Sequence, residues 1–130
     1  MAVTIVLADD EPDLRSVYAE FLRGEGHDVW EASDGREALD LVAEHRPALL
    51  LLDIWMPAVN GFEVHDALRH DPVATTLKVV LLSNLGDADS RLEGFSAGVA
   101  DFWVKGLSLD EFRDRVRLVL APGPAVHDPT

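Results

Sequence analysis

Residues 48–53 read Ala-Leu-Leu-Leu-Leu-Asp, an apolar run that ends at one charged side chain, Asp53. Consecutive apolar positions over this length are typical of a strand buried on both faces, because successive side chains of a strand point to opposite faces. Such strands occur in the middle of parallel sheets that helices cover on each side. The stretch therefore predicts a layered α/β domain with residues 48–53 as a central strand.

The rest of the chain alternates short apolar runs with amphipathic segments. We expect four further strands, at residues 3–8, 29–30, 77–82 and 102–104. Apolar residues at helical spacing, with glycine, proline and a Ser-x-x-Glu capping box at the ends, predict five helices at about residues 12–24, 36–46, 61–68, 92–98 and 108–120. Alternation of this kind requires right-handed crossovers and predicts a doubly wound parallel sheet.

Length and charge limit the function classes. With 130 residues, the chain has the length of one domain. It carries 24 Asp and Glu against 11 Lys and Arg, and a net charge of −13 argues against binding to nucleic acid or to an anionic membrane surface. The absence of cysteine excludes disulfides and thiolate chemistry. The first residues lack the basic region of a signal peptide, and no apolar run is long enough to span a membrane. We therefore expect a cytoplasmic location.

Several polar side chains follow directly after the predicted strands, where open α/β sheets bind their ligands. They are the acidic run from Asp9 to Glu11, then Asp53, Ser83 and Lys105. If the first and third strands are neighbours, Asp9, Asp10 and Asp53 converge, and such a group of carboxylates suits Mg²⁺. A lysine and a hydroxyl beside a cation can hold a phosphoryl group, and no Ser–His or Cys–His pair is visible, so an aspartate is the best acceptor.

In this order, the motifs resemble the receiver domain of two-component response regulators, from Val3 to about Leu120. The likeness is carried by Asp9-Asp10, by the run from Asp53 to Pro57 with Asn60-Gly61 after it, by Ser83, and by the run from Phe102 to Lys105. The resemblance implies a flavodoxin-like five-stranded parallel sheet of order 2-1-3-4-5 with five helices. We therefore expect a receiver domain at 1–121, followed at 122–130 by a flexible tail or the beginning of a linker.

The resemblance also implies a role for each matching residue. Asp53 would accept a phosphoryl group from a sensor histidine kinase or a phosphotransfer protein. Mg²⁺ would be bound by Asp10, Asp53 and the backbone carbonyl of Trp55, and by Asp9 through a water molecule. Ser83 and Lys105 would hold the phosphoryl oxygens, and Phe102 would be the aromatic switch residue that changes a surface for a downstream output protein or domain. Such a domain catalyses chemistry only on itself.

Four positions modify this expectation. Gly106 stands where the family usually has proline, which predicts a more mobile loop after Lys105. Asn84 replaces a smaller residue after Ser83 and could narrow access to the site. Trp55 and Leu85 are apolar at positions that influence phosphate loss in the family, and we expect them to shield an acyl phosphate from water.

Other interpretations stay open at this point. The acidic run could serve only as the first turn of a helix, Ser83 as a helix cap, and Phe102 as core packing. One alternative function is a Mg²⁺-dependent phosphohydrolase with an aspartate nucleophile, which would need a second acidic residue where Trp55 stands. Another is a pseudo-receiver, which would bind proteins without being phosphorylated. Homodimerisation is left undecided. The five histidines have no metal-ligand spacing, and we expect them on the surface.

Overall fold

A single parallel sheet forms the centre of the computed structural model, which describes residues 2–71, 76–84 and 99–121. Five strands pair in the order β2-β1-β3-β4-β5, and every pairing is parallel. The strands are β1 (Thr4–Ala8), β2 (Asp28–Ala32), β3 (Leu49–Asp53), β4 (Lys78–Ser83) and β5 (Asp101–Val104). This confirms the predicted fold class and strand order.

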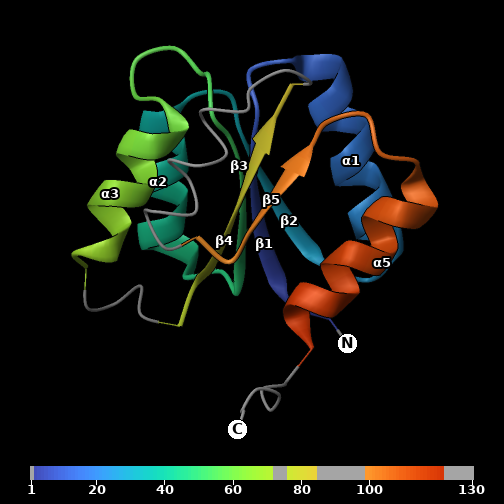
Figure 1. Ribbon diagram of the computed structural model, residues 1–130. Coiled ribbons are helices and arrows are strands. Elements are labelled where there is room, and N and C mark those ends of the chain that lie inside the picture. Colours follow the sequence, from blue (N-terminus) through green and yellow to red (C-terminus); the bar gives the residue numbers. More distant parts are fainter. Residues whose placement is uncertain (1, 72–75, 85–98, 122–130) are drawn as a thin grey trace, which may run out of the picture.

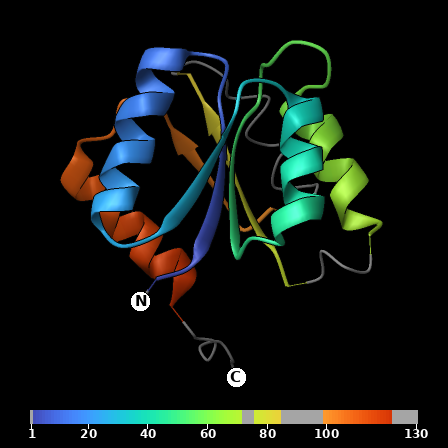
Figure 2. The same ribbon diagram turned by 180° about the vertical axis from the view of Figure 1, so that it is seen from behind.

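Helices cover both faces of the sheet. Figure 1 shows α1 and α5 on one side and α2 and α3 on the other, and Figure 2 shows the same two layers from behind. The helices are α1 (Pro12–Gly24), α2 (Gly35–His45), α3 (Gly61–Arg69) and α5 (Leu109–Leu120). The helix expected at 92–98 and the tail expected at 122–130 lie outside the described residues. None of the described helices is both long and apolar enough to cross a lipid bilayer.

The central strand β3 is buried along its whole length, as the sequence predicts. Leu50 and Leu52 pack into the core on the α2 and α3 side, whereas Leu49 and Leu51 pack into the core on the α1 and α5 side. Complete burial of a leucine side chain contributes roughly 2 kcal/mol of hydrophobic free energy. Both cores therefore fix the strand, and with it the position of Asp53 at its carboxyl end.

The start of α3 is fixed by a capping box next to this strand end. Asn60 Oδ1 accepts a hydrogen bond from the Glu63 backbone N–H at 2.9 Å, and Glu63 Oε1 accepts one from the Asn60 N–H at 2.9 Å. The Gly61 N–H then donates to the Ile54 carbonyl at 2.7 Å. The cap thus holds the first residue of α3 against the end of β3.

We predict that Gly61→Ala destabilises the fold. A Cβ at Gly61 would lie 2.5 Å from the Asp53 carbonyl oxygen and 2.8 Å from Ile54 Cα, so backbone atoms would have to shift. Overpacking of this kind costs about 1–3 kcal/mol, which urea unfolding can measure. Gly24→Ala is the matched control, because nothing lies within 4 Å of a Cβ there. Equal stability of the two variants would contradict the close approach at Gly61.

The expectation that the histidines lie on the surface was wrong for His65, and His127 lies outside the described residues. His65 is only 5 % exposed, on the buried face of α3 together with Val64 and Leu68. Helical spacing places His65 near the face of Leu68, three residues on, and the extent to which α3 is covered then decides its burial. Burial lowers the pKa of His65, with a further contribution from Arg69.

Candidate functional site

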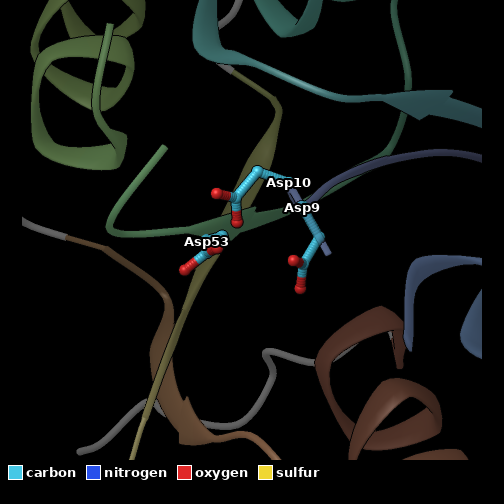
Figure 3. A group of neighbouring side chains, drawn as sticks. All are labelled: Asp9, Asp10 and Asp53. Carbon is cyan, nitrogen blue, oxygen red and sulfur yellow. The ribbon is translucent and has the colours of Figure 1, made fainter. Parts of the chain in front are cut away.

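The carboxyl ends of the two central strands bring together three aspartates. Ala8 and Leu52 are register partners in β1 and β3, so Asp9 and Asp10 follow one strand directly beside the point where Asp53 ends the other. One carboxylate oxygen from each residue lies within 4.8 Å of the other two. Figure 3 shows the three side chains gathered at this edge of the sheet. The convergence expected from the sequence is present.

Lys105 extends into this acidic group from the end of β5. Its Nζ lies 3.0 Å from Asp53 Oδ2, 3.0 Å from Asp9 Oδ2 and 3.5 Å from Glu11 Oε1. The Lys105 side chain is 6 % exposed, and those of Asp9 and Asp53 are 0 % and 4 % exposed. The Lys105 backbone N–H also donates to the Ser83 carbonyl at 2.7 Å, which ties the ends of β4 and β5 together. The lysine is thus a buried counter-charge for two buried carboxylates.

One lysine does not neutralise this group of carboxylates. Burial raises the pKa of Asp53 to about 7; the nearby charge of Asp9 acts in the same direction, while the hydrogen bond from Lys105 opposes it. Burial acts to lower the pKa of Lys105, but its hydrogen bonds to Asp53 and Asp9 prevail and raise it. The site therefore favours an additional positive charge.

The buried oxygen atoms of the site are not all paired. Asp9 Oδ2 lies 3.0 Å from Lys105 Nζ, which donates to Oδ1 of the same carboxylate at 3.2 Å. Ser83 Oγ, in a residue that is 1 % exposed, accepts or donates no hydrogen bond within the described part of the chain. Unpartnered buried polar atoms are costly and call for a ligand or water. The set of hard carboxylate oxygens fits Mg²⁺, and the free hydroxyl fits an oxyanion.

Comparison with known proteins agrees with this arrangement. Residues 5–117 match the model of the response regulator receiver domain family. The chain belongs to this family. Receiver domains are modules of two-component signalling, and the acidic triad described above is typical of their Mg²⁺ sites.

Similar proteins include longer regulators and isolated receivers. The chain is 33 % identical over 116 residues to the DNA-binding dual master transcriptional regulator RpaA of Synechocystis sp., covering 89 % of this chain and 48 % of that protein. It is 36 % identical over 120 residues to response regulator MprA of Mycolicibacterium vanbaalenii, covering 92 % and 51 %. This receiver thus spans about half the length of the curated relatives that it matches.

Solved structures show the same fold. The receiver domain of NtrX from Brucella abortus superposes with a TM-score of 0.83 at 28 % identity, covering 92 % of this chain and 99 % of that one. The chemotaxis protein CheY4 of Vibrio cholerae has a TM-score of 0.85 at 25 % identity, covering 92 % and 100 %. Both chains correspond to this receiver along nearly their whole length.

The positions flanking the receiver site are placed as follows. The Trp55 backbone N–H donates to Asp53 Oδ1 at 3.3 Å, and the Trp55 side chain is half exposed. Phe102 is 7 % exposed and belongs to the core on the α2 and α3 side. Asn84 is exposed, and Leu85 lies outside the described residues.

Gly106 has a conformation that proline cannot adopt. Its φ is +94°, whereas the ring of proline fixes φ near −65°. The chain turns here from β5 toward Ser108, whose hydroxyl caps α5 by accepting from the Glu111 N–H at 3.1 Å. This receiver therefore uses glycine for a backbone turn after Lys105, rather than only tolerating it in place of the usual residue.

Sequence reasoning missed two contributors to the site. Glu11 was included only in the acidic run, but it contacts Lys105. Arg15 was not singled out, although its Nη1 donates to the Asp9 carbonyl oxygen at 2.6 Å. The position of Glu11 next to Asp9 and Asp10 was a usable signal, whereas nothing in the spacing of Arg15 distinguishes it from other surface residues of α1.

Proposed function

We propose that this receiver accepts a phosphoryl group on Asp53 from a sensor histidine kinase or a phosphotransfer protein, with Mg²⁺ as cofactor. The observation that supports the proposal most directly is the buried Asp53 carboxylate, 3.0 Å from Lys105 Nζ and beside Asp9 and Asp10. We place the reaction in the cytoplasm, in keeping with the family.

The reaction follows from the side chains at the site. An Asp53 carboxylate oxygen attacks the phosphorus of a phosphohistidine, the P–N bond breaks, and the imidazole nitrogen keeps the electron pair. The product is an acyl phosphate on Asp53. Lys105 neutralises charge on the transferred group, and the Ser83 hydroxyl donates to a phosphoryl oxygen, which is the hydrogen bond that it lacks in the described structure.

The acidic residues hold the cofactor. When bound, Mg²⁺ supplies the positive charge that the phosphoryl oxygens need in the transition state. Asp10, Asp53 and the Trp55 backbone carbonyl are its proposed direct ligands, and Asp9 is its ligand through water. Because Asp9 and Asp53 are buried on fixed strand ends, little reorganisation of these ligands is required.

Phosphorylation would then change a partner surface. The phosphoryl group gives Ser83 and Lys105 new charge-assisted hydrogen bonds, which can bias a two-state element. We propose Phe102 as that element, because it lies on β5 three residues before Lys105 and packs in the core on the α2 and α3 side. The surface that responds, formed by the expected helix at 92–98 with β5 and α5, would bind a downstream output protein or domain.

Mass spectrometry of the intact protein tests the proposal. Incubation with Mg²⁺ and acetyl phosphate should add the mass of one phosphoryl group. Omission of Mg²⁺ with a chelator, or the Asp53→Ala variant, should prevent the addition. If the wild type gains no mass, the pseudo-receiver interpretation is favoured. Turnover of a phosphate monoester would instead indicate a phosphohydrolase, which nothing at the position of Trp55 supports.

Trp55 is predicted to prolong the life of the acyl phosphate. Trp55 follows Asp53 by two residues and is half exposed, so its ring can keep water from the phosphoryl group. Trp55→Asn should shorten the half-life of phospho-Asp53 several-fold in a time course of released phosphate, and Leu85→Asn should act in the same direction. Trp30→Asn is the control, on β2 away from the site. An unchanged half-life in Trp55→Asn would refute the shielding role.

Gly106 is predicted to position Lys105. Gly106→Ala places a side chain at positive φ, which costs about 1–2 kcal/mol. Gly26 has φ +96° and, like Gly106, has no atom within 4 Å of a Cβ, so Gly26→Ala carries the same strain far from the site. Both variants should lose similar stability, but only Gly106→Ala should slow phosphorylation. Equal rates in the two variants would argue against the positioning role.

A further inference from the structure

Arg15 makes a contact with the metal-binding end of β1 that the proposed mechanism does not use. Its Nη1 donates to the Asp9 carbonyl oxygen at 2.6 Å, and its Nε donates to Glu31 Oε1 at 3.1 Å. The guanidinium is mostly buried, with 18 % of the side chain exposed. It therefore connects β1, α1 and β2 at the edge of the site.

Glu31 is itself held in place from the other side. Its second carboxylate oxygen accepts from Arg23 Nη1 at 3.1 Å, and Arg23 Nη2 donates to the Val29 carbonyl at 2.7 Å. The rigid guanidinium of Arg15 can donate to Glu31 and to the Asp9 carbonyl at the same time. The orientation of Arg15 is thus set by a network anchored on β2.

The Asp9 carbonyl belongs to the peptide unit that joins Asp9 to Asp10. The Asp9 N–H donates to the Ala32 carbonyl at 3.0 Å, and Asp9 Oδ1 accepts from the Glu11 N–H at 2.9 Å. With Arg15 on the carbonyl, the backbone of Asp9 is fixed at both of its polar groups. These bonds also hold the plane of the Asp9–Asp10 peptide, and with it the position of the Asp10 Cα from which the exposed carboxylate extends.

We infer that Arg15 is a positioning residue for Mg²⁺ binding, which orients Asp10 through the Asp9 carbonyl and is itself oriented by Glu31. The inference rests on the proposed function, because it concerns the same metal site. Groups that orient metal ligands without touching the metal typically contribute 10–100-fold to affinity. Arg15→Gln should therefore raise the dissociation constant for Mg²⁺ by about tenfold.

Arg117→Gln provides a control that separates positioning from general stability. Arg117 Nη2 on α5 donates to Glu25 Oε1 at 2.8 Å, so it also makes a charged bond between two segments of the chain, but it does not belong to the network of Arg15, Glu31 and Arg23. Both variants should lower the melting temperature, whereas only Arg15→Gln should weaken Mg²⁺ binding. Arg15→Lys should give an intermediate affinity, because an ammonium can reach the carbonyl but lacks the fork geometry.

The experiment is titration of the full chain with MgCl₂, followed by calorimetry and by tryptophan fluorescence, to which Trp55 contributes beside the site, with melting temperatures measured in chelator. Weaker binding in Arg15→Gln, with wild-type binding in Arg117→Gln, supports the inference. Equal binding in the wild type and in Arg15→Gln overturns the inference and leaves the proposed function standing. If the wild type itself binds no Mg²⁺, the proposed function fails and this inference fails with it.

Discussion

Lys105→Met should slow phosphoryl transfer to Asp53 about a hundredfold, since removal of one preorganised donor from a site of this type costs 10²–10³ in rate. The lysine Nζ lies 3.0 Å from Asp53 Oδ2, in a position to neutralise charge on the transferred group. Methionine has a similar length and no charge, so the change isolates the ammonium group. The rate is measured from the time course of phosphoprotein formation with acetyl phosphate.

Lys78→Met is the matched control for this variant. Lys78 is exposed on β4, and its Nζ donates to the Val119 carbonyl at 2.8 Å, so the substitution removes a lysine hydrogen bond far from Asp53. Lys105→Arg keeps the charge but changes its geometry, and should recover only part of the rate. Wild-type rates in Lys105→Met would mean that the lysine serves only to balance the buried carboxylates.

Asp53→Asn should stabilise the metal-free protein at pH 8. Burial raises the pKa of Asp53 from its ordinary value of 3.8 to about 7, so the folded state holds a proton that the unfolded state releases. The resulting penalty is absent below pH 4, grows as the pH rises from 4 to 7, and is complete above 7. Each unit of difference between the two pKa values corresponds to about 1.4 kcal/mol, so the penalty on the free energy of unfolding has an upper limit of roughly 4 kcal/mol. We expect about 1–3 kcal/mol, because solvent near the exposed Asp10 screens part of it.

Urea unfolding of both proteins in chelator, at several pH values, measures this effect. The difference in free energy of unfolding between Asp53→Asn and the wild type should shrink as the pH falls from 7 toward 4. It should also shrink on addition of Mg²⁺, which stabilises only the protein with an intact site. Asp40→Asn removes one negative charge from the exposed surface of α2 and should show neither trend. A gain independent of pH would indicate that Asp53 carries no buried-charge penalty.

The sequence was sufficient to predict the sheet because its signals are local and strong. Every residue of β3 is apolar up to Asp53, and burial on both faces follows directly from that pattern. The convergence of Asp9, Asp10 and Asp53 was also predictable, since parallel strands place their carboxyl ends at one edge. The alternation of predicted strands and helices was enough to predict a sheet covered by helices on both faces. The order of the strands in the sheet depended on the family resemblance.

What could not be predicted depends on tertiary geometry. The contact of Arg15 with the Asp9 carbonyl requires the exact direction in which α1 leaves the sheet. The conformation of Gly106 was not predictable, because glycine is compatible with both signs of φ. The burial of His65 depends on how much of α3 is covered, which helical periodicity alone does not define.

The central claim is that Asp53 is the residue that carries the phosphoryl group. Peptide mapping by mass spectrometry, after reaction with Mg²⁺ and a small phosphoryl donor, tests it most directly. We predict one phosphoryl group, located on the peptide that contains Asp53 and absent from Asp53→Asn. A phosphoryl group on the peptide that contains Asp9 and Asp10, or unchanged uptake by Asp53→Asn, would contradict this account.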